Sequence, residues 1–284
     1  MTIHCLFSGT WARTKRLIQT NKTESDMKIF VCIKQVPDTE TKIKVAADQN
    51  SIDSTGVKWV LNPYDEHAVE EAVKFKEKNP SAQVWAITVG PKTRAVESLR
   101  TALAMGADEA IVINSGDQID ALSTAKALSS VIKSEGGAHL VFTGKLAIDS
   151  NQSSVPQMVA EYLSIPHTSV VSKIETSSES VLVERDVEGG AKEVVQMMNP
   201  SLVAANKGLN MPRYASLPGI MKAKKKVIKE VELSSLNISD SDQKVKYVRY
   251  TLPTEKPAVK LIAGDVSTQS IELIKLLRDE AKVL

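Results

Sequence analysis

The residues best suited to chemistry lie in the stretch 144–155, GKLAIDSNQSSV, where small and polar side chains follow an apolar run. Gly144 and Lys145 come directly after a predicted strand, and residues 149–154 supply carboxylate, amide and hydroxyl groups ahead of a predicted helix. Backbone N–H groups at such a loop bind phosphates, because a helix N-terminus carries partial positive charge. The stretch therefore predicts a nucleotide site, although it is neither a Walker loop nor a GxGxxG fingerprint. An ordinary polar loop with a helix cap is the alternative.

A second stretch, residues 209–226, reads LNMPRYASLPGIMKAKKK and contains no catalytic residue set. Pro212 and Pro218 fix their own φ and push the residues before them toward extended backbone. Residues 213–217 are therefore predicted to form a protruding loop with Leu217 at its tip. An exposed leucine beside arginine, tyrosine and serine has the apolar centre and polar rim of a docking surface. A buried connector with a solvated lysine tail is the alternative.

Composition argues against several classes of protein. The 284 residues are 25% charged and 42% hydrophobic, which is ordinary for a globular chain. A net charge of +2 is small for a dedicated nucleic-acid binder, and the lysines of 222–226 lack interleaved aromatics. No apolar run approaches the roughly 18 residues of a membrane span. We therefore expect neither nucleic-acid binding nor direct membrane insertion.

The cysteines and histidines do not indicate a metal site. Cys5 and Cys32 form no spacing motif, so we expect neither a disulfide framework nor zinc, and a reducing compartment is indicated. The four histidines are scattered, without a carboxylate or cysteine cluster around them. Residues 1–26 lack acidic residues until Glu24 and carry four basic ones, which is compatible with an organelle transit peptide. A poorly ordered extension or an upstream start is the alternative, and we leave this segment outside the fold.

The elements that would position both stretches alternate between strand and helix. Short apolar runs predict buried strands at residues 28–33, 84–89, 110–113 and 140–143. Helices are predicted between them and after them, at residues 63–79, 93–105, 119–134 and 156–163. This alternation predicts an α/β, Rossmann-like fold with a parallel sheet covered by helices on both faces. Ligands bind such sheets at the carboxyl ends of the strands, which here are followed by the loops 32–38, 62–66 and 144–155.

The pattern changes after Pro166 to short strands, predicted at 169–174, 181–187, 193–197 and 202–204. We interpret them as a small β-rich addition that leads to the stretch 209–226. Residues 227–243 are polar and serine-rich, which predicts a linker or surface arm, and residues 267–283 predict an amphipathic helix. The predicted organisation is an extension over 1–26, a nucleotide-binding domain over 27–226, and a C-terminal arm and helix over 227–284.

Residues 183–204, VERDVEGGAKEVVQMMNPSLVA, resemble the signature of the electron transfer flavoprotein beta subunit family. The matching positions are Arg185, Glu188, Gly189, Gly190, Glu193 and Pro200. Other family motifs follow in the same order and spacing: IKQVPDT at 33–39, LNPYDEHAVEEAV at 61–73, RTALAMGAD at 100–108, GKLAID at 144–149 and PRYASLPGIMKAKKK at 212–226. The resemblance covers residue 27 to roughly the C-terminus.

The resemblance implies an electron carrier subunit that works with partners and has no substrate turnover of its own. In the family, a larger alpha subunit holds most of the FAD. The heterodimer carries electrons from flavin dehydrogenases, such as acyl-CoA dehydrogenases, to a membrane quinone oxidoreductase. The beta subunit contributes a buried AMP. The residues matching its cofactor loops are Cys32, Asn62, Pro63, Tyr64, Asp65, Val89, Gly144, Lys145, Ala147, Ile148, Asp149, Ser150, Asn151, Gln152, Ser153, Ser154 and Val155.

The same resemblance implies that residues 209–226 are the family's recognition loop, whose leucine, here Leu217, anchors in a pocket on the dehydrogenase. The implied docking residues are Arg213, Tyr214, Ala215, Ser216, Leu217, Pro218, Ile220 and Met221. Lys222 and Lys225 match lysines that are methylated in some members, a change that keeps their charge. The tail is implied to pack on the alpha subunit. The implied location is a bacterial cytoplasm, or the mitochondrial matrix if residues 1–26 are a transit peptide.

Two other functions stay open. Bifurcating relatives hold a second FAD in place of AMP, but the stretch 149–156 lacks the Gly and Thr of their loop. It also departs from the usual AMP-type loop, and Thr39 stands where an aromatic residue is often found. AMP is favoured because residues 213–226 resemble the housekeeping type. The second alternative is a nucleotide-binding regulator of the same adenine nucleotide alpha hydrolase-like fold, with Leu217 buried.

Overall fold

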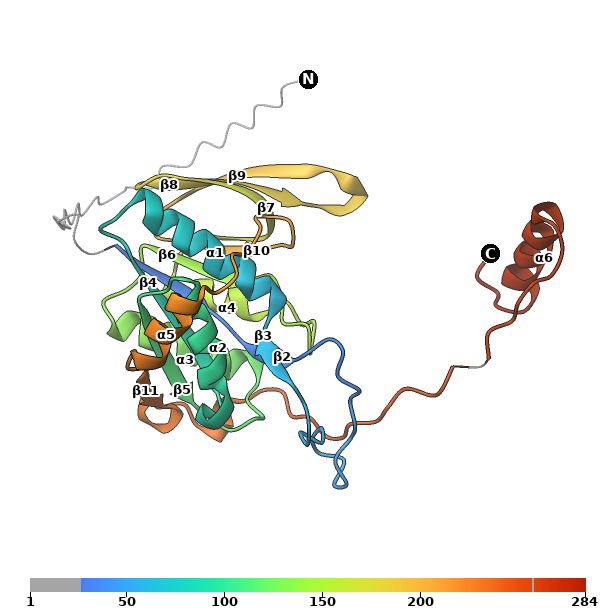
Figure 1. Cartoon of the computed structure of the whole chain (residues 1–284), viewed down its shortest axis with the longest axis horizontal. Helices are drawn as coiled ribbons and strands as arrows, with labels where there is room; N and C mark the ends of the chain where they lie inside the picture. Colours follow the sequence, from blue (N-terminus) through green and yellow to red (C-terminus); the bar gives the residue numbers. More distant parts are fainter. Residues whose placement is uncertain (1–26, 257) are drawn as a thin grey trace, which may run out of the picture. The chain divides into compact units, whose positions relative to one another are not determined.

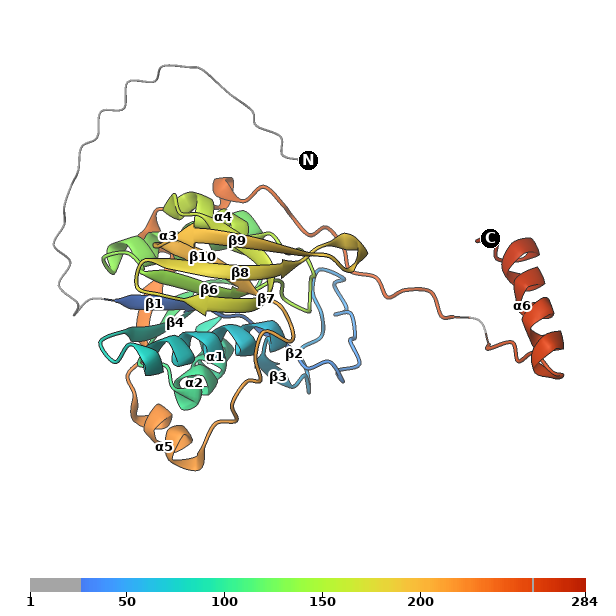
Figure 2. The same ribbon diagram turned by 90° about the horizontal axis from the view of Figure 1, so that it is seen from above.

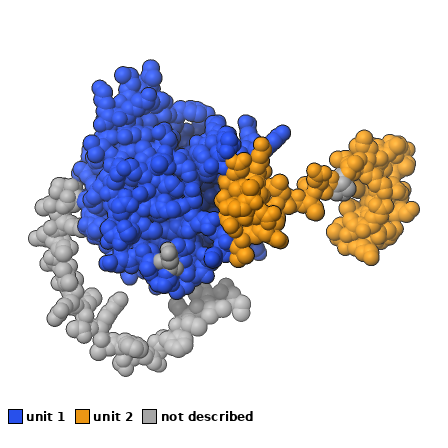
Figure 3. All heavy atoms as spheres, turned by 90° about the horizontal axis from the view of Figure 1, so that it is seen from below, with its two compact units in different colours: residues 1–42, 54–247 blue, residues 43–53, 248–284 orange. Residues whose placement is uncertain are grey.

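The structure is a computed structural model that describes residues 27–256 and 258–284. The predictions made for residues 1–26 lie outside the described residues. The chain divides into two compact units (Figure 3). Among the described residues, the larger unit contains 27–42 and 54–247, and the smaller unit contains 43–53 and 248–284.

A nine-stranded sheet forms the centre of the larger unit, in the order β11-β5-β4-β1-β6-β10-β7-β8-β9 (Figure 1). Its parallel part contains β1 (Lys28–Cys32), β4 (Gln83–Gly90), β5 (Glu109–Asn114), β6 (Leu140–Gly144), β10 (Ser201–Ala205) and β11 (Lys229–Glu232). β7 (His167–Thr176) is parallel to β10, and β8 (Ser180–Asp186) and β9 (Lys192–Met198) continue antiparallel. A second, two-stranded sheet pairs β2 (Gln35–Pro37) with β3 (Trp59–Leu61). The predicted α/β class is confirmed.

Helices cover both faces of the sheet because its central strands are apolar on both sides. Along β1, Ile29 and Val31 belong to one core cluster, and Phe30 and Cys32 belong to the other. Figure 2 shows α1 (Pro63–Lys78) and α2 (Lys92–Met105) on one side, and α3 (Ala121–Ser134) and α4 (Val155–Leu163) on the other. The near-continuous apolar runs of the sequence are therefore explained by burial on two faces.

The β-rich region predicted after residue 166 belongs to the larger unit, where β10 returns between β6 and β7 and makes it continuous with the main sheet. One sequence interpretation needs correction. The linker predicted over 227–243 is wrong for residues 229–232, which form β11 beside β5. Within β11, only Val231 packs on the core. The strand is also attached by an ion pair, in which Lys92 Nζ lies 2.5 Å from Glu230 Oε2. Charged residues on an edge strand prevent it from pairing with strands of other molecules. They also interrupt the apolar pattern by which a strand is predicted from sequence.

The smaller unit contains an isolated antiparallel bridge between Val45 and Ile52, and α6 (Val266–Asp279). Asp265 caps α6 by accepting from the N–H of Thr268 at 2.8 Å. The predicted C-terminal helix is confirmed, with its end four residues earlier than predicted. Ile271 and Ile274 on α6 are exposed. Within the described part of the chain, no helix has the length and apolar character to cross a membrane.

Candidate functional site

The strand order reverses at the carboxyl edge of the sheet, between β1 and β6, and this switch point is named the nucleotide crevice below. From β1 the chain proceeds through β4 to β5 on one side, and it returns at β6 on the other side of β1. Such a reversal separates the loops that follow the two central strands, and it is where α/β sheets bind ligands. Cys32 ends β1, Gly144 ends β6, and residues 62–65 begin α1. The structure thus gathers these predicted cofactor residues at one edge.

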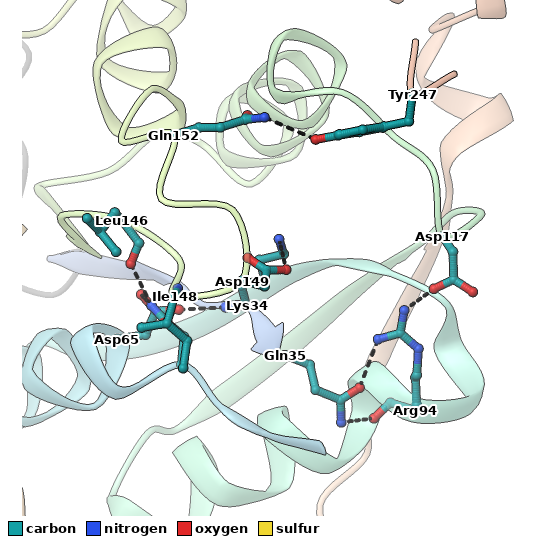
Figure 4. A network of polar contacts seen from close by, with 11 residues as sticks. Lys34, Gln35, Asp65, Arg94, Asp117, Leu146, Ile148, Asp149, Gln152 and Tyr247 are labelled. Carbon is teal, nitrogen blue, oxygen red and sulfur yellow. Dashed lines mark hydrogen bonds and ion pairs between the residues drawn. The ribbon is translucent and has the colours of Figure 1, made fainter. Parts of the chain in front are cut away.

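Asp65 lies beside Lys34 and the loop that follows β6 (Figure 4). Its Oδ1 accepts from the N–H of Gly144 at 3.0 Å and from Asn62 Nδ2 at 2.9 Å, and its Oδ2 accepts from the N–H of Lys34 at 2.7 Å. Burial raises the pKa of Asp65 to about 7, against the lowering effect of these hydrogen bonds. Both carboxyl oxygens are bonded to protein donors, so Asp65 joins β1, β6 and α1.

Asn62 extends these contacts to the loop that follows β6. Its Nδ2 also donates to the carbonyl of Leu146 at 2.9 Å, and its Oδ1 accepts from the N–H of Ile148 at 3.2 Å. Pro63 then opens α1 at a position where a missing N–H costs nothing. The short sequence from Asn62 to Asp65 therefore fixes the backbone of residues 144–148.

Gly144 is required by this close approach. A Cβ at this position would lie 2.3 Å from Asp65 Oδ1 and 2.7 Å from Tyr64 Cβ. The backbone of β6 consequently passes directly against the start of α1. The sequence analysis named Gly144 as a site residue because it follows a predicted strand. The contact with Asp65 and Tyr64, which excludes any larger residue, is visible only in the structure.

The loop that follows, residues 145–154, has the features of a phosphate cradle. Asn151 and Ser153 have positive φ values of 53° and 50°, and left-handed residues are a component of anion-binding backbone nests. Ser153 Oγ donates to the carbonyl of Lys145 at 2.8 Å. Ser154 is the N-cap of α4 and makes no side-chain capping hydrogen bond, so the positive end of α4 remains open for an anion.

Thr143 is a polar residue of this edge that the sequence reasoning missed. Its hydroxyl is buried and has no hydrogen-bond partner among the described residues. It lies in register with Cys32 on β1, so both side chains belong to the same face of the sheet. Burial raises the pKa of the Cys32 thiol, with Asp65 adding to the effect, so Cys32 is a neutral group that lines the site.

The sequence signal for Thr143 was a threonine inside the apolar strand LVFTG. In the described part of the chain, a buried hydroxyl without a partner and a helix N-terminus without a side-chain cap together fit a nucleotide phosphate and base.

Charged groups surround the mouth of the crevice. Lys34 Nζ lies 2.6 Å from Asp149 Oδ2, which links the loops after β1 and β6. Lys145 Nζ lies 5.1 Å from the centre of the Tyr64 ring. Arg94, near the start of α2, pairs with Asp117 and lies 4.0 Å from the centre of the Trp59 ring. Predicted residue Val89 lies on β4, in register with Ile113 of β5. The predicted cofactor residue Asp149 is ion-paired with Lys34 of the predicted loop 32–38, and Arg94 is a charged residue that the prediction did not include.

The predicted docking residues begin α5 (Leu217–Lys225). Ser216 is the N-cap and accepts from the N–H of Gly219 at 3.2 Å. Leu217 is 72% exposed and Tyr214 is 99% exposed, and Met211 and Met221 are also exposed. The alternatives that bury Leu217 within this chain are therefore wrong. Residues 209–225, named the docking segment below, present several apolar side chains to the surroundings.

Arg213, predicted as a docking residue on the polar rim, is ion-paired with α1 and about one third exposed. Its Nε and Nη2 donate to the two carboxylate oxygens of buried Glu70 at 2.8 and 3.0 Å, and its Nη1 donates to Glu77 at 2.6 Å. These carboxylates raise the pKa of Arg213. Asn210 adds a second attachment, with Nδ2 donating to Glu71 at 2.9 Å. Arg213 and Asn210 therefore fix the base of the docking segment to α1.

Fold and crevice together define a class: an α/β protein of the Rossmann-like, nucleotide-binding type. No group of three or more His, Cys, Asp or Glu side chains that could hold a metal lies in the described part of the chain. Comparison with known families narrows the class. The electron transfer flavoprotein domain matches residues 49–236, and the chain belongs to the electron transfer flavoprotein family.

Curated relatives agree with this assignment and confirm the resemblance. Electron transfer flavoprotein subunit beta of Bacillus subtilis (strain 168) is 42% identical over 263 residues, which cover 91% of this chain and 100% of that protein. The mitochondrial subunit beta of Oryza sativa subsp. japonica is 40% identical over 263 residues, with the same coverage. The Mus musculus subunit beta is 37% identical over 238 residues, covering 82% of this chain and 92% of that protein. Electron transport by a flavoprotein is thus the role of the family.

Proposed function

We propose that this chain is the beta subunit of a heterodimeric electron transfer flavoprotein. In this role it pairs with an alpha subunit and carries electrons from flavin dehydrogenases, such as acyl-CoA dehydrogenases, to a membrane quinone oxidoreductase. The observation that carries the proposal is exposed Leu217 on a docking segment fixed to α1, in a chain of this family. The subunit has no substrate turnover of its own in this proposal.

The docking segment has the properties that a carrier needs. A carrier must leave each partner quickly, and small interfaces with one apolar anchor exchange faster than large ones. Leu217 offers such an anchor, while the contacts of Arg213 and Asn210 hold its position without covering it. Exposed Ile271 and Ile274 on α6 support the further proposal that the C-terminal tail packs on the alpha subunit.

The crevice is proposed to hold AMP. The backbone of residues 145–154 and the start of α4 would bind the phosphate, Thr143 would satisfy its hydroxyl on the ligand, and Cys32 would line the floor. FAD, held mostly by the alpha subunit, supplies the electron-accepting chemistry of the heterodimer. Binding of AMP to the folded chain alone would also stabilise the fold by mass action. A second FAD remains the alternative occupant, but the loop lacks the Gly and Thr typical of that type.

Cofactor quantification tests this proposal. The two subunits are co-expressed, the purified complex is denatured, and released flavin and adenine nucleotides are measured by chromatography. One FAD and one AMP per heterodimer are expected. Two FAD without AMP would overturn the AMP assignment, and a colourless homodimer would overturn the carrier role. The location proposed for the complex is a bacterial cytoplasm or the mitochondrial matrix.

A further inference from the structure

A short segment before the C-terminal tail is attached to the loops of the nucleotide crevice. Residues 242–247, named the strap, are attached at several places, and the first attachment joins Asp242 to Lys126 on α3 at 2.5 Å. The second is Asp120, whose Oδ2 accepts from the N–H groups of Lys244 and Val245 at 2.7 and 3.2 Å. The third is a hydrogen bond of 3.0 Å from Gln152 Nε2 to the hydroxyl of Tyr247.

The attachment to Asp120 is firm. Asp120 is buried, and its Oδ1 also caps α3 by accepting from the N–H of Ser123 at 2.8 Å. Burial opposes ionisation of Asp120, but these backbone hydrogen bonds hold its pKa below its ordinary value. A carboxylate that accepts three N–H bonds is a strong acceptor, since charged hydrogen bonds exceed neutral ones in strength. Residues 242–245 are thereby fixed to the start of α3.

The third attachment reaches the phosphate loop. Asp120 follows β5 and Gln152 follows β6, and β4 and β1 lie between these strands in the sheet. A segment attached at both places therefore runs along the edge where β4 and β1 end, beside the crevice. Figure 4 shows Gln152 and Tyr247 pointing toward each other, above the Lys34–Asp149 pair in that view.

The Gln152–Tyr247 bond is the part of this arrangement that can open. It is neutral and lies at the surface, so it is weaker than the charged contacts of Asp120. Gln152 lies between Asn151 and Ser153, which both have positive φ. The left-handed conformation is unfavourable for a serine and less so for an asparagine, so contacts around the loop help to maintain it. Tyr247 is placed to hold the loop in this conformation.

We propose that the strap closes the nucleotide crevice, and that Tyr247, acting through Gln152, is a positioning residue that slows nucleotide release. This inference rests on the proposed AMP site. The strap holds the phosphate loop over the bound nucleotide from outside, while Asp65 and Asn62 hold the same loop from inside. Release requires the Gln152–Tyr247 bond to break before the loop moves.

The test measures nucleotide exchange in the co-expressed heterodimer. The complex is loaded with radiolabelled AMP and diluted into excess unlabelled AMP, and label retained on a filter is followed in time. Tyr247→Phe keeps the ring and removes the bond, and we expect release to become about fivefold faster, as for loss of one typical neutral hydrogen bond. Asp242→Asn loosens the other end of the strap and is expected to accelerate release in the same direction.

Two controls separate this role from a general loss of structure. Lys246 lies in the strap and makes no hydrogen bond or ion pair within the described residues, so Lys246→Gln is expected to leave release unchanged. Gln152→Ala should accelerate release as much as Tyr247→Phe, and the double variant should be no faster than either single one. If the two substitutions loosened the structure independently, their effects on the release rate would add in the double variant.

The outcomes also separate the strap from the AMP proposal. If the complex contains AMP and Tyr247→Phe and Asp242→Asn release it at the wild-type rate, the strap is rejected and the AMP site stands. Additive effects in the double variant would likewise overturn the role of the Gln152–Tyr247 bond. A wild-type complex without bound adenine nucleotide would overturn both proposals.

Discussion

The nucleotide crevice and the docking segment are both attached to α1, but they use it in opposite ways. At the start of α1, Asn62 and Asp65 are buried and bond to the backbone N–H groups of Lys34, Gly144 and Ile148. Further along α1, Glu70 and Glu77 hold only the base of the docking segment, and Leu217 is left exposed. This difference fits the two proposed roles, since bonded, buried side chains fix the backbone of a ligand site, whereas partner exchange requires an uncovered apolar anchor.

The largest effect on stability is expected from Arg213→Ala. The substitution leaves Glu70, whose side chain is 5% exposed, without its cation. Loss of one partner of a buried ion pair costs about 3–5 kcal/mol, and the partial exposure of Arg213 places this case near about 3 kcal/mol. Urea unfolding of the heterodimer measures the loss. Transfer from a dehydrogenase should fall as well, because the base of the docking segment is released.

Lys222→Ala is the matched control for this variant. Lys222 lies on α5, and its side chain makes no hydrogen bond or ion pair inside the described ranges. Its removal should change the unfolding free energy by less than about 0.5 kcal/mol. Equal losses in Arg213→Ala and Lys222→Ala would mean that Arg213 does not support the docking segment through α1.

A smaller loss, of about 2 kcal/mol, is expected from Gly144→Ala. The new methyl group would meet Asp65 Oδ1 at 2.3 Å, so β6 and α1 must move apart, and overpacking of this kind costs about 1–3 kcal/mol. AMP content should fall too, because the loop after β6 shifts. Gly116→Ala is the control, since nothing lies within 4 Å of its added Cβ. Unaltered AMP content in Gly144→Ala would count against the role of this close approach.

The pH dependence of stability should report on Asp65. An unfolded aspartate titrates near pH 4, and burial raises the pKa of Asp65 to about 7 in the fold. Between these values the folded chain binds more protons, so the stability due to this group falls as pH rises from about 4 to 7, then levels. Asp65→Asn cannot titrate. The stability difference, wild type minus variant, should fall by at most about 1.4 kcal/mol per pH unit in this window.

Urea unfolding at pH 5.5, 6.5 and 8 measures this difference. Asparagine offers an N–H donor where the carboxylate accepts, so the variant is less stable throughout, and only the change with pH is informative. A difference that is constant across the three pH values would show that Asp65 does not titrate between them.

Sequence reasoning succeeded where the signal is local. Apolar runs gave the strands, and loops at strand ends gave the edge that contains Gly144 and Asn62. It failed where a residue is defined by a distant partner. Arg213 and Glu70 are 143 positions apart, and nothing near Arg213 in the chain indicates that its charge is occupied. The charged residues of β11 concealed it as a strand. On an edge strand, charged side chains point to solvent or pair with neighbouring side chains instead of packing in the core.

The smallest effect on stability is expected from Leu217→Ala, which should leave the unfolding free energy within about 0.5 kcal/mol of wild type, because the side chain is 72% exposed. AMP content should also be unchanged. The efficiency of electron transfer from an acyl-CoA dehydrogenase should fall about tenfold, since burying a leucine in a partner contributes about 1.5–3 kcal/mol. Val227→Ala, an exposed apolar residue just outside the docking segment, should transfer at the wild-type rate. Arg213→Ala is expected to lose both stability and transfer, and Leu217→Ala only transfer. If Leu217→Ala also loses AMP, or keeps full transfer, the two regions are not separated in the way the contacts along α1 indicate.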